Sequence, residues 1–194
     1  MQQIIENNKR LFRMDQHLGE KAMAQVADSE LSWQANEDSN SIVTIVKHLW
    51  GNMLSRWTDF LTTDGEKPWR QRDAEFENPL LNRQEMMLLW NEGWQCLFHA
   101  LDGLTDADLD RVVYIRNEGH TVMDALSRQV AHYAYHVGQI VYLSKLRSTD
   151  AWKSLSIPRN QSAEYNAGKF AQEKATRNFA DEWIDKNGPD DIKY

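Results

Sequence analysis

Apolar residues recur every three or four positions in four long stretches of the chain, which places them on one face of an α-helix in each stretch. Polar residues occupy the remaining positions of these stretches. We predict four helices, over about residues 2–27, 41–62, 82–103 and 120–147. Asn82 followed by Glu85 resembles a capping box, and Gly103 is a stop signal for the third helix. Four amphipathic helices of this length predict an all-α protein built as a four-helix bundle.

The connecting segments are polar and long. The stretch "TTDGEKPWRQRDAEFENP", residues 62–79, is a charged loop of a length that is usually functional or mobile. The stretch "RVVYIR" before the fourth helix predicts a short extended piece. A further helix is expected over about residues 170–187. We therefore divide the chain into a bundle, residues 1–147, and a C-terminal extension, residues 148–194, that packs on the bundle or is partly mobile.

Composition narrows the classes of protein and of partner. A net charge of −7 excludes a broadly basic nucleic-acid-binding surface. No apolar run approaches the roughly 18–20 residues that span a membrane, and the N-terminus lacks a secretory signal. Cys96 is the only cysteine, so no intramolecular disulfide forms. We expect a cytoplasmic protein that binds neither nucleic acid nor membrane and acts on a small molecule.

Two histidines stand four residues apart in the fourth predicted helix, in "SRQVAHYAYHVGQIVYL". His132 and His136 point the same way because residues four apart are neighbours on a helix. Pairs at this spacing bind zinc when another element supplies a third ligand. The HExxH motif of metalloproteases is absent, because Tyr133 stands where glutamate is required. The alternative is that both histidines are ordinary packing residues.

The third ligand must come from elsewhere in the chain. Of the remaining histidines, His48 is the best candidate because it flanks the apolar stripe of the second predicted helix. His17 lies in a polar stretch, His99 lies near a helix end, and His120 is too far from His132 along the fourth helix. Three histidines with an open fourth position are typical of catalytic rather than structural metal sites.

Three further residues could serve the same face. Arg56, near the middle of the apolar stripe, and Asn52, one turn after His48, are candidate catalytic residues, with Asn52 orienting a ligand. Arg128, one turn before His132, is a candidate for binding the cofactor. Either arginine could hold a substrate carboxylate, because a buried arginine is costly unless paired. The alternatives are structural salt bridges, a guanidinium that reaches water, and an interior asparagine satisfied by backbone.

The charged loop also allows two interpretations. Trp69, Arg70 and Arg72 could form a lid or an anion clamp over the end of the bundle. Alternatively, one buried tryptophan pins the loop and the charges around it are solvated. Cys96 is interpreted as an inert buried thiol. Tryptophan and methionine residues at helical spacing are interpreted as core or dimer interface.

With its lone histidine in the second helix and HxxxH in the fourth, residues 1–147 resemble the DinB/YfiT-like superfamily of bacterial four-helix-bundle proteins. The strings "TTDGEKPWRQRDAEF" and "LSIPRNQS" resemble one poorly characterised branch of it. The resemblance implies a divalent metal held by His48, His132 and His136, and a homodimer. Better-understood relatives are thiol S-transferases and isomerases that use a low-molecular-weight thiol such as bacillithiol or mycothiol.

Three functions therefore stay open from the sequence. The first is a metal-dependent thiol S-transferase, in which the metal stabilises a thiolate nucleophile. The second is a metal-dependent hydrolase at the same site, which would use a bound water. The third is a non-enzymatic dimeric bundle with a vestigial site. We expect zinc or nickel, although three imidazoles also suit copper or iron(II).

Overall fold

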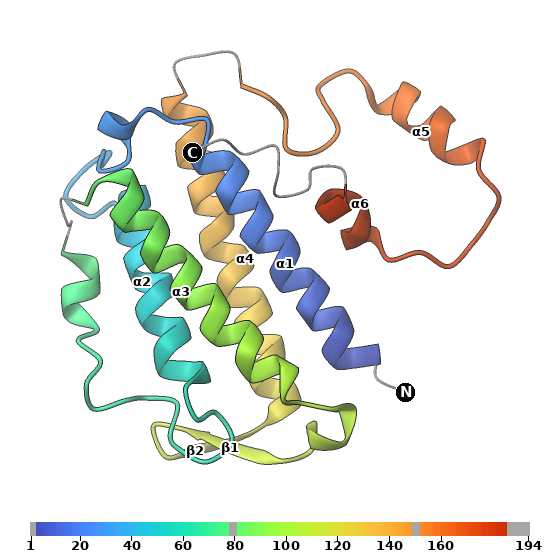
Figure 1. Ribbon diagram of the computed structural model, residues 1–194. Helices are drawn as coiled ribbons and strands as arrows, with labels where there is room; N and C mark the ends of the chain where they lie inside the picture. Colours follow the sequence, from blue (N-terminus) through green and yellow to red (C-terminus); the bar gives the residue numbers. More distant parts are fainter. Residues whose placement is uncertain (1–2, 78–80, 149–151, 186–194) are drawn as a thin grey trace.

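The protein is mostly helical, as predicted, and four long helices lie side by side (Figure 1). The computed structural model describes residues 3–77, 81–148 and 152–185. The long helices are α1 (Gln3–Met23), α2 (Ile42–Trp57), α3 (Arg83–Asp102) and α4 (Val122–Arg147). Helix α1 packs on α4, and α2 packs on both α3 and α4. The contact between α2 and α4 is the one that matters for the predicted metal site.

Helix α1 is shorter than predicted, because it ends at Met23 rather than near residue 27. The guanidinium of Arg83, on α3, donates to the backbone oxygens of Met23 (2.9 Å) and Val26, and its Nε donates to Asp28 (2.6 Å). The last carbonyls of a helix lack partners within the helix, and here a side chain from a distant element supplies them. Residue 2, the predicted start, lies outside the described residues.

Helix α2 also ends early, at Trp57 rather than near residue 62. Asp59 has a φ of 48°, a left-handed conformation that cannot continue an α-helix.

Helix α3 agrees with its prediction to within one residue at each end. Its capping box is confirmed, because Asn82 accepts from the Glu85 backbone N–H and the Glu85 side chain accepts from the backbone N–H of Asn82.

A β-hairpin lies between α3 and α4, which the all-α prediction lacked. Strand β1 (Val112–Ile115) falls within the predicted extended piece and pairs antiparallel with β2 (Glu118–Thr121). The turn residues Arg116 and Asn117 both have positive φ, as a two-residue hairpin turn requires. The second strand occupies the predicted start of the fourth helix. His120 therefore belongs to a strand and not to a helix.

The region after α4 folds differently from its prediction. The helix expected over residues 170–187 is found only in part: α6 (Phe179–Asp185) lies within it, but residues 171–178 are not helical, and a separate helix, α5 (Ser162–Phe170), precedes them. Helix α6 packs on α1, and α5 lies farther out (Figure 1). Residues 186 and 187 of the prediction lie outside the described residues. The division of the chain at residue 147 stays a prediction.

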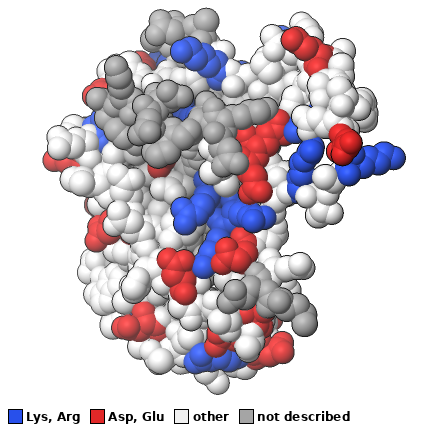
Figure 2. Space-filling view, turned by 45° about the vertical axis from the view of Figure 1, so that its right-hand side comes forward, with Lys and Arg blue, Asp and Glu red and all other residues white. Residues whose placement is uncertain are grey.

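Charges of both signs share the surface. Figure 2 shows one face on which basic side chains lie among acidic ones. Ion pairs near α1 include Lys9 with Asp102 (3.0 Å) and Arg10 with Asp181 (3.5 Å). None of the helices in the described residues combines the length and apolarity that a membrane crossing requires. The absence of nucleic-acid binding stays a prediction.

Aromatic side chains fill the centre of the molecule. The rings of Trp94 and Phe12 lie 5.8 and 5.7 Å from that of Tyr133, centroid to centroid, and Trp90 lies 5.4 Å from Trp94. Such tilted and edge-to-face pairs add to the stabilisation from burial. The tryptophans and methionines of the helices are therefore mainly core residues. The buried ones include Trp57, Met86, Met87, Trp90 and Trp94, while Trp50 is half-buried.

Gly19 allows α1 to approach Trp90, and we expect Gly19→Ala to destabilise the fold. A Cβ at position 19 would lie 2.6 and 2.7 Å from two ring atoms of the buried Trp90. Alanine normally stabilises a helix by about 1 kcal/mol relative to glycine. Overpacking against a rigid ring costs about 1–3 kcal/mol, so the net effect should be a loss. Urea denaturation checks this, with Gly138→Ala on α4 as control, because position 138 has open space and should gain stability.

Candidate metal centre

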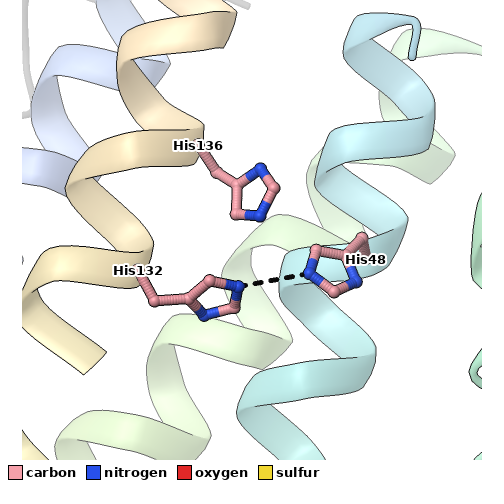
Figure 3. Close-up of side chains that lie close together, drawn as sticks. All are labelled: His48, His132 and His136. Carbon is pink, nitrogen blue, oxygen red and sulfur yellow. Dashed lines mark hydrogen bonds between the residues drawn. The ribbon is translucent and has the colours of Figure 1, made fainter. Parts of the chain in front are cut away.

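Three histidines from two helices point toward one another (Figure 3). His48 comes from α2, and His132 and His136 come from successive turns of α4. One ring nitrogen of each lies within 4.8 Å of the others, and Nε2 of His48 is 3.3 Å from Nε2 of His132. The structure thus brings together the three residues that the sequence proposed as ligands. His17, His99 and His120 lie outside this cluster.

The spacing and the donor set fit a divalent ion. Two imidazole nitrogens that each lie about 2.0–2.1 Å from one tetrahedral zinc ion are separated by about 3.3–3.4 Å. The observed separation of 3.3 Å between His48 and His132 matches that value. Imidazole is a common ligand of zinc, nickel, copper and iron. The cluster could therefore hold a divalent metal ion with His136 as the third ligand.

A second layer of side chains orients each imidazole. Each Nδ1 atom lies within hydrogen-bond distance of an oxygen that can only accept, so the proton resides on Nδ1 and the lone pair on Nε2. The acceptors are Glu75 for His48 (2.9 Å), Gln129 for His132 (3.1 Å) and Gln139 for His136 (2.9 Å). This arrangement leaves the Nε2 lone pairs of His48 and His132 facing each other. Two lone pairs at this distance repel, which favours a cation between them.

Burial keeps two of the histidines neutral. Burial, together with the neighbouring His136 and His48, lowers the pKa of His132 to about 3. Burial and the nearby His48 lower the pKa of His136 to about 4. Both imidazoles are therefore uncharged at neutral pH. Neutral imidazole is the form that binds a metal ion.

Glu75 and Arg70 form a buried ion pair next to His48, and the sequence did not single out this pair. Arg70 Nε donates to Glu75 Oε1 (2.7 Å) and Nη2 donates to Oε2 (2.9 Å), with the Arg70 side chain only 2% exposed. Burial alone raises the pKa of Glu75, but hydrogen bonds from His48 and Arg70 outweigh it, so the pKa is lowered. Glu75 is therefore an ionised acceptor.

This pair corrects the interpretation of the charged loop. Trp69 is 52% exposed, so a buried tryptophan does not pin the loop. The buried charges of Arg70 and Glu75 do so instead. Arg72 is exposed, and its guanidinium lies 5.2 Å from the ring centre of Phe76. Sequence pattern could not separate the buried charges from the solvated ones, because all of them stand in one polar stretch.

Arg56 and Asn52 are buried, and their polar groups contact other parts of the protein. Nη1 of Arg56 donates to the backbone oxygen of Gly65 and lies 3.4 Å from the Glu66 carboxylate. Asn52 Oδ1 accepts a hydrogen bond from the Tyr133 hydroxyl (3.1 Å), so a side chain rather than backbone satisfies it. These contacts favour the structural interpretation of both residues over a catalytic one.

Arg128 is exposed, unlike Arg56. Within the described residues it forms no ion pair with Asp or Glu, so the structural salt bridge expected as its alternative role is not found. Its positive charge is close enough to contribute to the lowered pKa of His132, after burial and the two neighbouring histidines. Arg128 is therefore a cation near the histidine cluster whose guanidinium is accessible to solvent.

Two aromatic rings flank the cluster. The ring of Phe76 lies 4.8 Å from that of His48, and the ring of Tyr135 lies 5.0 Å from that of His136. Tyr135 is exposed despite its size. Cys96 takes no part in this cluster; it is half-buried, and burial raises the pKa of its thiol. A raised pKa disfavours the reactive thiolate form, as expected of an inert thiol.

Comparison with known proteins gives a family but no activity. A family model described as a protein of unknown function (DUF1572) matches residues 1–161. The match covers α1 to α4, and so all three histidines, Arg70 and Glu75. No curated protein matches the chain.

Proposed function

The chain belongs to the DUF1572 family of proteins of unknown function, and we propose that it binds one divalent metal ion through His48, His132 and His136. The observation that carries this proposal is the cluster of three ring nitrogens within 4.8 Å of one another, together with an oxygen acceptor at each Nδ1 that leaves each Nε2 available as a ligand. A buried packing histidine also needs one acceptor for its N–H, but packing does not require the ring nitrogens of three histidines to gather within 4.8 Å of one another. Zinc or nickel suits three neutral imidazoles.

We propose further that the protein is a thiol S-transferase. A divalent ion at this site would lower the pKa of a bound thiol and so supply the thiolate nucleophile. His132 is only half-buried, so the cluster borders solvent at this residue. Phe76 and Tyr135 offer apolar walls, and Arg128 offers a cation for the carboxylate of a thiol such as bacillithiol.

The proposed reaction balances without an oxidant or a reductant. The thiol loses its proton to water, and its sulfur attacks an electrophilic carbon. A carbon–sulfur bond forms while the leaving group departs with its electron pair. The resemblance to the DinB/YfiT-like four-helix bundles supports this chemistry over hydrolysis. A homodimer and a cytoplasmic location belong to the same proposal, and rest on that resemblance and on the single cysteine.

Activity assays with the zinc- or nickel-loaded protein test the proposal. Consumption of an alkyl halide or epoxide that requires added bacillithiol, mycothiol or glutathione would support S-transfer. Turnover of an ester or amide without thiol would overturn it in favour of a hydrolase. Bound metal without turnover in either assay would overturn the enzyme proposal and leave a bundle that acts through a partner.

Arg128→Met separates the carboxylate-binding role from metal binding. Charge-assisted hydrogen bonds contribute about 1.5–3 kcal/mol, so KM for a carboxylate-bearing thiol should rise about tenfold or more. Metal content should stay unchanged, because Arg128 is not a ligand. Arg111→Met is the control, because Arg111 is also exposed but pairs with Asp108 just before β1. Equal KM values for the two variants would exclude the role of Arg128.

A further inference from the structure

Glu75 lies between a histidine and an arginine, and all three side chains are buried. Its Oε2 accepts from His48 Nδ1 (2.9 Å) and from Arg70 Nη2 (2.9 Å), and its Oε1 accepts from Arg70 Nε (2.7 Å). A buried carboxylate is costly unless a paired cation neutralises it. Arg70 supplies that cation, and the carboxylate still has an oxygen that accepts from His48.

The other two histidines have weaker partners. His132 and His136 donate to the neutral amides of Gln129 and Gln139, each three residues away on α4. Only His48 donates to a carboxylate, and that carboxylate comes from a loop rather than from its own helix. Hydrogen bonds to an ionised group are roughly twice as strong as neutral ones. His48 is therefore the imidazole that is held most firmly.

Helix α2 makes room for this carboxylate. Gly51 lies one turn after His48, and a Cβ at that position would be 2.4 Å from Glu75 Oε1 and 2.8 Å from its Cδ. Glycine inside a helix costs about 1 kcal/mol relative to alanine. Among residue types only proline is less favourable than glycine inside a helix, and α2 has a glycine at the point where Glu75 approaches. Any side chain at position 51 would push the carboxylate away from His48.

The loop is anchored independently of the histidines. Asp64 accepts from the backbone N–H groups of Arg116 (2.9 Å) and Asn117 (2.8 Å) in the hairpin turn. Closer to Glu75, Lys47 Nζ donates to the backbone oxygen of Ala74 (2.5 Å). These contacts hold the loop against both the hairpin and α2. Glu75 is therefore preorganised before any ligand arrives.

We infer that Glu75, with Arg70 behind it, is a positioning residue that fixes the Nδ1–H tautomer of His48 and so strengthens metal binding at the three-histidine cluster. The metal-binding part of this inference rests on the proposed function. The tautomer part does not, because it concerns the metal-free protein. Loss of an outer hydrogen-bond partner of a metal ligand typically weakens metal affinity by about 10–100-fold.

Gly51→Ala is the sharpest test, because the atoms that its methyl group would meet are the mobile end of the Glu75 side chain. The helix should stay folded while the carboxylate moves away from His48. The control is Gly138→Ala, which makes the same change on α4 where there is open space. A second variant, Arg70→Met with Glu75→Leu, removes both charges and the oxygen acceptor together and leaves no unpaired buried ion.

Two measurements read the outcome. Long-range proton–nitrogen NMR of the metal-free protein should show His48 as the Nδ1–H tautomer in the wild type and in Gly138→Ala. In Gly51→Ala and in the double variant, His48 should shift toward the Nε2–H tautomer, with His132 and His136 unchanged. Zinc affinity, measured by competition with a chelator, should fall about 10–100-fold in those two variants only.

The outcomes distinguish this inference from the proposed function. An unchanged His48 tautomer and unchanged zinc affinity in Gly51→Ala and in the double variant would overturn the inference and leave the metal site standing. If His48 shifts its tautomer in the two variants but the wild-type protein binds no zinc, the positioning role is supported and the proposed function is overturned. A fall in zinc affinity without a tautomer shift would overturn the mechanism inferred for Glu75.

Discussion

His136→Ala should reduce the zinc or nickel content of the protein from about one ion per chain to near zero. His136 supplies one of the three candidate ligands found in the described residues. The remaining pair, His48 and His132, should not retain an ion against solvent at low concentration. The measurement is elemental analysis of protein purified without an affinity tag. Wild type and variant are compared after the same incubation with zinc or nickel and the same removal of free ion.

His99→Ala is the matched control, because His99 is exposed on α3 and lies outside the cluster. It should keep the metal content of the wild type. Added metal should also stabilise the wild type against unfolding, by about 2.7 kcal/mol when the free ion is at 100 times its Kd. The His136→Ala variant should show no such gain. Equal metal content in all three proteins, or none in any, would refute the proposed site.

Asp15→Asn should stabilise the protein by up to about 4 kcal/mol at pH 8 and by clearly less at pH 5. Asp15 lies on the buried face of α1 and is 5% exposed, and no ion pair neutralises it within the described residues. Burial raises the pKa of its carboxyl from 3.8 to about 7. Asparagine has nearly the same shape and no charge to bury.

The direction of the pH dependence follows from proton binding. Between about pH 4 and pH 7 the folded protein retains the Asp15 proton that the unfolded chain has released. The unfolded state then binds fewer protons, so the free energy of unfolding falls as pH rises through this window. Urea denaturation of metal-free wild type and Asp15→Asn across the window should show a widening difference. The control Asp38→Asn, at an exposed position, should show none.

A constant difference between wild type and Asp15→Asn across the window would refute this account of Asp15.

The same position also shows what a sequence pattern can reveal. Phe12, Asp15, Gly19 and Ala22 follow one another at helical spacing, and all four are buried. Their helical spacing therefore places Asp15 in the apolar stripe of α1. The pattern could have identified this residue, although its raised pKa depends on what α1 packs against.

Local features of the sequence determined most of the helices and the relative placement of two of the three candidate ligands. Capping signals and periodicity located α3 almost to the residue, because they act within one helix. The spacing of His132 and His136 placed them on one face of α4 for the same reason. His48 could be proposed because it flanks an apolar stripe. Only the packing of α2 on α4 brings it within 3.3 Å of His132.

Tertiary structure alone decided the surroundings of the histidines. The early end of α1 depends on Arg83, which donates to the Met23 carbonyl from a distant helix. Glu75, which is buried with Arg70, contacts His48 on α2, a separate element. Arg70 and Glu75 stand among several charges in one polar loop, and residue type does not tell which of them become buried. Gly51 likewise looks like an unfavourable helix residue until Glu75 is seen against it. Periodicity reports the face that a helix buries, but the partner on that face is set by long-range packing, which no local pattern encodes.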